Sequence, residues 1–149
     1  MTGRRRPPLR LQVTDRGRPR TSRAFVADVV RTVLAFAARE ELAVSLLLTD
    51  DREIGAIHAA HLGDPSPTDV ISFDDDGDGA EIVVSVQTAH RIARARGHAG
   101  RAEVALYIVH GLLHVLGWND TNRRERVRMR RAERECLARL GLEVAPVDA

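Results

Sequence analysis

The chain has 149 residues, of which 44% are hydrophobic and 30% are charged. This length suits one domain with one hydrophobic core, and the composition is that of a globular protein rather than a fibrous or disordered one. No apolar run approaches the roughly 18 residues that span a membrane, the first 23 residues hold no apolar segment typical of a signal peptide, and Cys136 is the single cysteine. We therefore expect one domain over residues 1–149, in a cytosolic protein without a membrane partner.

The net charge of +2 conceals three segments of opposite sign. Residues 1–23 carry eight Arg and one Asp, residues 50–81 carry ten acidic side chains and one Arg, and residues 123–139 carry eight Arg and three Glu. Basic ends around an acidic middle are typical of a protein that holds a polyanion at its periphery, although solvated surfaces give the same pattern. Residues 1–8 are expected to form a flexible basic tail.

In chain order, hydrophobic periodicity predicts the elements β-α-β-α-β-β-α-α-α. The predicted strands cover residues 9–13, 42–48, 70–73 and 81–85. The predicted helices cover residues 22–39, 50–62, 86–96, 101–116 and 122–140. The stretch 63–67 holds two prolines and is expected to be a loop, and the acidic stretch 74–79 a solvated turn. This order predicts an α+β fold in which about five helices pack with a four-stranded mixed sheet.

Single residues indicate several helix ends. Ser22 is expected to cap the first helix, and Gly97 and Gly141 are expected to end the third and the last. The helix at 101–116 is apolar on all sides, which predicts that it is buried at the centre of the fold. Cys136 falls on the apolar face of the last helix and is expected to be unreactive.

The central helix carries the motif His110-Gly-Leu-Leu-His114-Val-Leu-Gly117-Trp-Asn-Asp120. His110 and His114 are one turn apart on one face, so both imidazoles can bind one metal ion. Gly117 can adopt a positive φ and end the helix, after which the chain can return Asp120 to the same ion. Two His, a glycine turn and a third ligand are the spacing of zincin metal sites.

Each of these residues also has a structural interpretation. The two histidines would otherwise be core residues that are hydrogen-bonded to the backbone. Asp120 would otherwise be the N-cap of the final helix, a role that Asn119 or Asn122 can also take. Because zincin peptidases carry their general base directly after the first His, and Gly111 stands there, the sequence disfavours a metallopeptidase. Metal chemistry without that base also suits phosphodiester hydrolysis.

The chain resembles the YbeY-type endoribonucleases that mature ribosomal RNA in bacteria. The resemblance covers roughly residues 46–140 and rests on four segments: Leu48-Thr-Asp-Asp-Arg-Glu-Ile54, Pro67-Thr-Asp-Val-Ile-Ser-Phe73, Glu81-Ile-Val-Val-Ser85 and Val109-His-Gly-Leu-Leu-His-Val-Leu-Gly-Trp118. The family's metal motif is H-G-x-L-H-x-x-G-x-D-H, so His110 and His114 match its first two ligands.

Two departures from the family pattern stand out. The third His of the family falls at Asp120, whose carboxylate is also an ordinary zinc ligand. The family's Asn…Tyr-Arg falls at His58, His61 and Leu62, and a leucine cannot contact a phosphate as the arginine is thought to do. Whether Arg52 or Arg91 replaces that arginine stays open.

The resemblance implies a zinc-dependent hydrolase that cleaves single-stranded RNA in ribosomal RNA maturation and ribosome quality control. One Zn²⁺ per chain would be held by His110, His114 and Asp120, with catalysis through metal-bound water. Thr68, Asp69 and His61 would line the cleft, although a turn cap explains Thr68 and Asp69 equally well and an exposed helix position is the commoner role of a histidine such as His61. The implied partners are ribosomal RNA, the small ribosomal subunit and ribosome-assembly proteins.

A second hypothesis is a metal-stabilised ribosome- or RNA-binding factor with little hydrolytic activity, which Leu62 favours. In either case, the arginines of the first segment and of the last helix would neutralise phosphates. The chain has five aromatic residues, namely Phe25, Phe36, Phe73, Tyr107 and Trp118. Base-stacking surfaces are therefore scarce, and sequence-specific readout of bases is not expected.

Overall fold

The structure, a computed structural model, describes residues 7–62, 70–74 and 79–145, apart from the side chains of residues 61 and 62. Its elements follow the predicted order. The strands are β1 (Leu11–Asp15), β2 (Ala43–Thr49), β3 (Val70–Asp74) and β4 (Gly79–Ser85). The helices are α1 (Arg23–Phe36), α2 (Asp51–Leu62), α3 (Val86–Arg96), α4 (Gly100–Val115) and α5 (Arg123–Arg139). The predicted loop at 63–67 and most of the acidic turn lie outside the described residues.

The four strands form one mixed sheet in the order β1-β2-β4-β3. β1 and β4 run parallel to β2, and β3 runs antiparallel to β4 at the edge. Parallel neighbours need a long connection, which α1 provides between β1 and β2. The predicted α+β fold with a four-stranded mixed sheet and five helices is confirmed.

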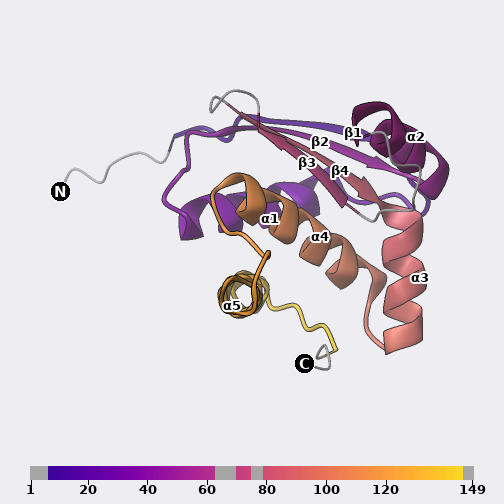
Figure 1. The fold of residues 1–149 in the computed structure, drawn as a ribbon. Coiled ribbons are helices and arrows are strands. Elements are labelled where there is room, and N and C mark those ends of the chain that lie inside the picture. Colours follow the sequence, from indigo (N-terminus) through magenta and orange to yellow (C-terminus); the bar gives the residue numbers. More distant parts are fainter. Residues whose placement is uncertain (1–6, 63–69, 75–78, 146–149) are drawn as a thin grey trace.

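Helices cover both faces of the sheet (Figure 1). α1 and α4 lie against one face, α5 packs on α4 away from the sheet, and α2 lies on the opposite face. α4 is therefore enclosed between the sheet and α5, and ten of its 16 residues are buried. This confirms the prediction of a buried central helix.

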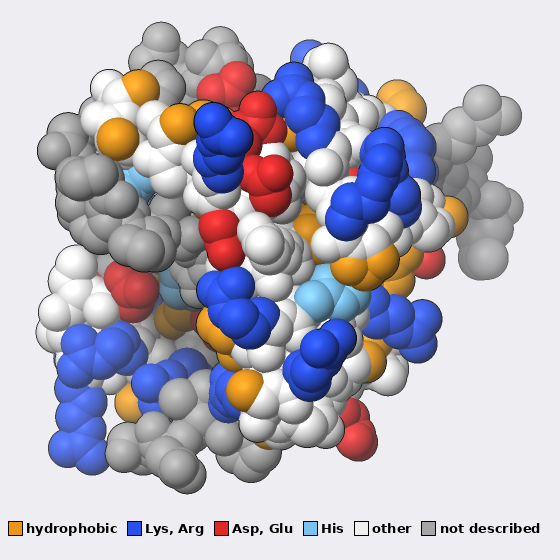
Figure 2. All heavy atoms as spheres, turned by 90° about the vertical axis from the view of Figure 1, so that its right-hand side faces the viewer, with side chains coloured by type: hydrophobic (Ala, Val, Ile, Leu, Met, Phe, Trp, Pro, Cys, Tyr) orange, Lys and Arg blue, Asp and Glu red, His pale blue; other side chains and the backbone are white. Residues whose placement is uncertain are grey.

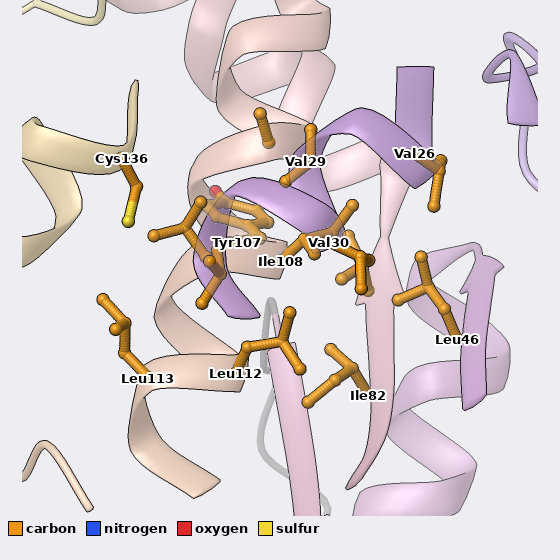
Figure 3. Close-up of a cluster of buried hydrophobic side chains, with 14 of the residues drawn as sticks. Val26, Val29, Val30, Leu46, Ile82, Tyr107, Ile108, Leu112, Leu113 and Cys136 are labelled. Atoms are coloured by element: carbon orange, nitrogen blue, oxygen red, sulfur yellow. The ribbon is translucent and has the colours of Figure 1, made fainter. Parts of the chain in front are cut away.

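The main core lies between the sheet, α1, α4 and α5 (Figure 3). Ile82 of β4 belongs to it, whereas the adjacent Val83 belongs to a smaller cluster with Ile54 of α2, because successive strand residues face opposite sides of a sheet. Cys136 of α5 is fully buried in the main core. Burial raises the pKa of its thiol to about 11, so the reactive thiolate is scarce at neutral pH.

The boundaries differ from the prediction mainly around α1. Ser22 caps this helix as expected, accepting a hydrogen bond from the backbone N–H of Phe25. The helix ends at Phe36 instead of Arg39, because Ala38 has a φ of +56° and reverses the chain. Since the left-handed residue here is an alanine, no glycine marked the stop. β1 lies two residues later than predicted.

The other helix ends follow the sequence signals. Gly97 and Gly141 have φ values of +80° and +69°, which end α3 and α5 at the predicted positions. Among the described residues, no helix is both long enough and apolar enough to cross a membrane.

Candidate metal centre

The two histidines of the motif lie where α4 emerges from the core. One side of the helix opens to solvent near its end: the His110 side chain is 31% exposed and His114 is exposed. The apolar residues Leu112 and Leu113, which lie between them in the sequence, are fully buried and fix the helix against the sheet and α5. The imidazoles are thus carried by a rigid element but can be reached from solvent.

Gly117 ends α4 and turns the chain back toward the histidines. Its φ is +107°, and its N–H donates to the carbonyl of His114 at 3.2 Å. The N–H of Trp118 donates to the carbonyl of Leu113 at 2.9 Å. These two bonds form a Schellman motif, which requires a left-handed residue at the glycine position. The predicted glycine turn is therefore present.

The turn brings Asp120 to His110. Asp120 Oδ2 lies 3.8 Å from His110 Nε2, and the Asp120 side chain is 43% exposed. The N-cap of α5 is Asn122, whose side-chain oxygen accepts from the N–H of Glu125 at 2.8 Å, and Glu125 Oε1 accepts in return from Asn122 Nδ2. The alternative assignment of Asp120 as this cap is therefore wrong, and its carboxylate is not used to cap the helix.

Glu133 of α5 is a partner of His110 that sequence reasoning missed. Its Oε1 lies 2.9 Å from His110 Nδ1, and its side chain is only 13% exposed. Because a carboxylate only accepts hydrogen bonds, Nδ1 carries the proton, and in the neutral imidazole the lone pair is on Nε2, which faces Asp120. The sequence held one signal: Glu133 stands four residues after Met129 and four before Leu137, which places it on the apolar face of the helix. Both of these neighbours are buried in the structure.

The predicted ligand set is assembled only in part. His110 and Asp120 face each other, and His114 lies one helical turn further along α4. Within residues 7–62, 70–74 and 79–145, no three His, Cys, Asp or Glu side chains are gathered into a complete cluster for a metal ion.

Most of the predicted cleft residues lie outside the described part of the chain. Thr68 and Asp69 are outside the described residues, and His61 is placed only as part of α2. Val70, where β3 begins, lies beside the motif: a Cβ atom built on Gly111 would be 3.3 Å from Val70 Cγ2. His58 on α2 is half-buried, and its Nδ1 is buried without a hydrogen-bond partner in the described part of the chain.

A separate polar cluster joins the N-terminal ends of α2 and α3. Asp51 Oδ1 accepts from Ser85 Oγ at 2.5 Å and from Thr88 Oγ1, and its Oδ2 accepts from Arg91 Nη1 at 3.0 Å. Burial of Asp51 opposes ionisation, but these hydrogen bonds outweigh it and lower the pKa of the carboxyl below its usual value. α2 and α3 lie on the face shown in Figure 2, where Arg side chains surround a smaller acidic group. Arg91 is thus already paired, whereas Arg52 of α2 is exposed.

The fold and the motif together define an α+β protein with a two-histidine, glycine-turn and carboxylate motif at the end of a buried helix. A family model described as Endoribonuclease YbeY matches residues 12–141. The chain therefore belongs to the YbeY endoribonuclease family.

Individual relatives agree with this assignment. The chain is 35% identical over 134 residues to an Endoribonuclease YbeY from Heliobacterium modesticaldum, covering 74% of this chain and 81% of the relative. It is 40% identical over 114 residues to the protein of that name from Pelotomaculum thermopropionicum, covering 69% and 75%. A solution structure of a Thermotoga maritima protein matches with a TM-score of 0.63 at 19% identity, covering 88% of this chain and 91% of the other. This last likeness concerns the fold alone.

Proposed function

We propose that this protein is a zinc-dependent endoribonuclease that cleaves single-stranded RNA during ribosomal RNA maturation and ribosome quality control in the cytosol. Membership of the YbeY family supports endoribonuclease activity. The observation that carries the metal dependence is the approach of Asp120 to the Nε2 atom of His110, with Glu133 holding the opposite side of the same ring.

Two of the three proposed ligands, His110 and Asp120, support a zinc ion by their geometry. Two atoms bound to one tetrahedral zinc at about 2.0–2.1 Å are separated by about 3.3 Å, and the His110 Nε2 to Asp120 Oδ2 distance is 3.8 Å. A histidine ligand usually donates its other N–H to a carboxylate, which is the geometry of His110 and Glu133. Imidazole and carboxylate donors on a site open to solvent match the ligands of catalytic zinc.

In the proposed site, His110, His114 and Asp120 hold the ion and Glu133 orients His110. When bound, zinc supplies a Lewis acid and lowers the pKa of water, both of which assist phosphodiester hydrolysis. The chain itself supplies positive charge for RNA on α5. Thr68, Asp69 and His61 are proposed to line the same cleft, and the proposed partners are ribosomal RNA, the small ribosomal subunit and ribosome-assembly proteins.

One observation favours the alternative of an RNA-binding factor with little hydrolytic activity. Leu62 replaces the family arginine, and Arg91, one of the two candidate substitutes, is paired with Asp51 and Thr88. Of the two candidates to replace the family arginine, Arg52 therefore remains, and it is exposed. Cleavage that survives in an Arg52→Ala variant would exclude Arg52 from this role.

The test is zinc content and ribonuclease activity of the purified wild type, His114→Ala, Asp120→Ala and Asp28→Ala. Asp28→Ala removes an exposed carboxylate of α1 and is the matched control. We expect about one zinc per chain in the wild type and the control, loss of zinc in the two site variants, and cleavage of single-stranded RNA only with zinc bound. A folded wild type that binds no zinc would overturn the metal site, and a zinc-loaded wild type that cleaves no RNA would favour the alternative.

A further inference from the structure

A surface groove runs between the end of α1, the α4–α5 turn and α5. It has a volume of about 470 Å³, and its lining includes Phe36, Trp118, Arg128, Arg131 and Arg139. Two of the five aromatic side chains of the protein thus lie together in one surface groove. Their ring centroids are 5.8 Å apart and the ring planes are inclined by 52°.

Each ring of this groove already has a flat cation against it. The guanidinium carbon of Arg128 lies 5.0 Å from the Trp118 ring centroid, and that of Arg139 lies 5.4 Å from the Phe36 centroid. Both rings therefore offer a face to a planar group on the surface. Alternating guanidinium groups and aromatic faces are the surface that stacks nucleobases and binds the phosphates between them.

The charge of α5 is directed outward. Two of its three acidic residues are engaged elsewhere, Glu125 with the N-cap and Glu133 with His110. The third, Glu135, lines the groove and pairs with Arg139 at 3.2 Å. Arg128 and Arg131 are exposed, and no acidic partner of either is observed among the described residues. The groove thus combines apolar ring faces with a net positive rim.

The position of the groove links it to the candidate metal centre. Trp118 directly follows Gly117, the residue that turns the chain from His114 toward Asp120. Trp118 therefore places the groove next to the turn that carries the candidate ligand Asp120.

We propose that this groove binds a short single-stranded segment of RNA, with bases stacked on Trp118 and Phe36 and phosphates held by Arg128 and Arg131. On binding, the guanidinium of Arg128 leaves the indole face for a phosphate, and a base takes its place on the ring. Bases of a single strand are free to stack in this way, whereas those of a duplex are not. The inference rests on the proposed function, since it supplies a substrate subsite beside the cleavage site.

Trp118 is the single tryptophan of the chain, so its fluorescence reports on the groove alone. The experiment titrates the wild-type protein with a labelled single-stranded RNA of mixed sequence, and records both tryptophan quenching and the anisotropy of the label. Inorganic polyphosphate serves as a polyanion without bases. Polyphosphate can draw Arg128 from the indole but has no base to stack in its place. We therefore expect RNA to quench Trp118 much more strongly than polyphosphate does.

Variants separate stacking from general charge. Arg128→Ala removes a groove arginine, and Arg134→Ala removes an exposed arginine of the same helix that does not line the groove. Phe36→Leu keeps an apolar side chain and removes the ring face. We expect Kd to rise by about fivefold or more in Arg128→Ala and Phe36→Leu, and by less than about twofold in Arg134→Ala. Thermal unfolding verifies that each variant is folded.

The outcomes are distinct. The inference is overturned if RNA does not quench Trp118. It is also overturned if Arg128→Ala and Arg134→Ala lose affinity equally, and in that case a protein partner would be the remaining occupant of the groove. Cleavage is measured on the same samples. If RNA binds in the groove but is not cleaved, the proposed function is refuted and the groove assignment stands. If RNA is cleaved and the groove variants bind it as the wild type does, the groove assignment is refuted and the proposed function stands.

Discussion

Gly111 follows the first histidine, at the position of the general base in zincin peptidases. It is buried against the sheet: a Cβ atom there would lie 3.1 Å from Ile82 Cγ2 and 3.3 Å from Val70 Cγ2. The glycine therefore allows α4 to approach β3 and β4 closely. A side chain at this position would point into the apolar packing between α4 and the sheet, and not toward the solvent-exposed side of the histidines. A residue at position 111 therefore cannot act as the general base.

A glutamate at position 111 is accordingly expected to damage the fold without creating a peptidase. Gly111→Glu places a carboxylate against Ile82 and Val70, and we expect a loss of at least about 3 kcal/mol in the free energy of unfolding. Urea denaturation and a peptidase assay check this. Near wild-type stability, or measurable peptide hydrolysis, would show that the position opens toward the histidines.

Glu133 acts on the proposed zinc through His110. Removing it in Glu133→Ala frees the imidazole to rotate, and we expect zinc affinity to fall by about 10- to 100-fold. Glu133→Gln retains an acceptor for the Nδ1 proton, so part of that affinity should return. Glu135→Ala, on the exposed side of the same helix, is the control. Competition with a chromophoric chelator measures the affinities, and equal values for all three variants would rule out a positioning role.

At the scale of the elements, Asp51 ties the beginning of α2 to α3. Because hydrogen bonds from Ser85 and Thr88 hold its pKa below the usual value of 3.8, the ionised form stabilises the fold. That contribution is present above the ordinary pKa and is lost as the pH falls through the lowered one. The carboxylate is 37% exposed, which limits the effect.

Asp51→Asn should therefore destabilise the protein at pH 7 by about 1 kcal/mol, and the difference from wild type should shrink as the pH falls from about 4 toward 2. Denaturation by urea at pH 7, 5 and 3 measures it. Asp28→Asn, an exposed aspartate of α1, provides the comparison. A difference between wild type and Asp51→Asn that does not change with pH would refute the linkage.

The elements also indicate which features a sequence reveals. Periodicity predicted the strands and helices that the described residues form, and the glycines at 97, 117 and 141 marked real left-handed stops. The end of α1 was not predicted correctly because an alanine, Ala38, adopts the left-handed conformation there. The cap of α5 was ambiguous because Asp120 and Asn122 share the same chemistry, and only the packing of the turn selects between them. Glu133 was missed because it lies on a different helix from His110, 23 residues later in the sequence, and only the packing of α5 on α4 brings the two side chains together.

For the molecule as a whole, the fold places two oppositely charged segments of the sequence on different sides of the sheet. The acidic segment begins at α2, on one side of the sheet, and the arginines of α5 lie on the other side, beyond α4 (Figure 1). A net charge of +2 therefore understates the potential on the α5 side. RNA is expected to meet the face that carries α5 and the groove.

This arrangement predicts a steep salt dependence for RNA binding. If about four phosphates of a single strand are neutralised, affinity should fall roughly 50-fold between 50 and 200 mM monovalent salt. Arg128→Ala removes one phosphate contact, which should reduce the slope of log K against log salt by about 0.7 for a single strand, whereas Arg94→Ala, at an exposed position of α3, should leave it unchanged. Fluorescence anisotropy across this range measures the slopes. A flat salt dependence would mean that RNA binds without the arginines of α5, and equal slopes for the two variants would mean that RNA binding is not confined to the side of the molecule that carries α5.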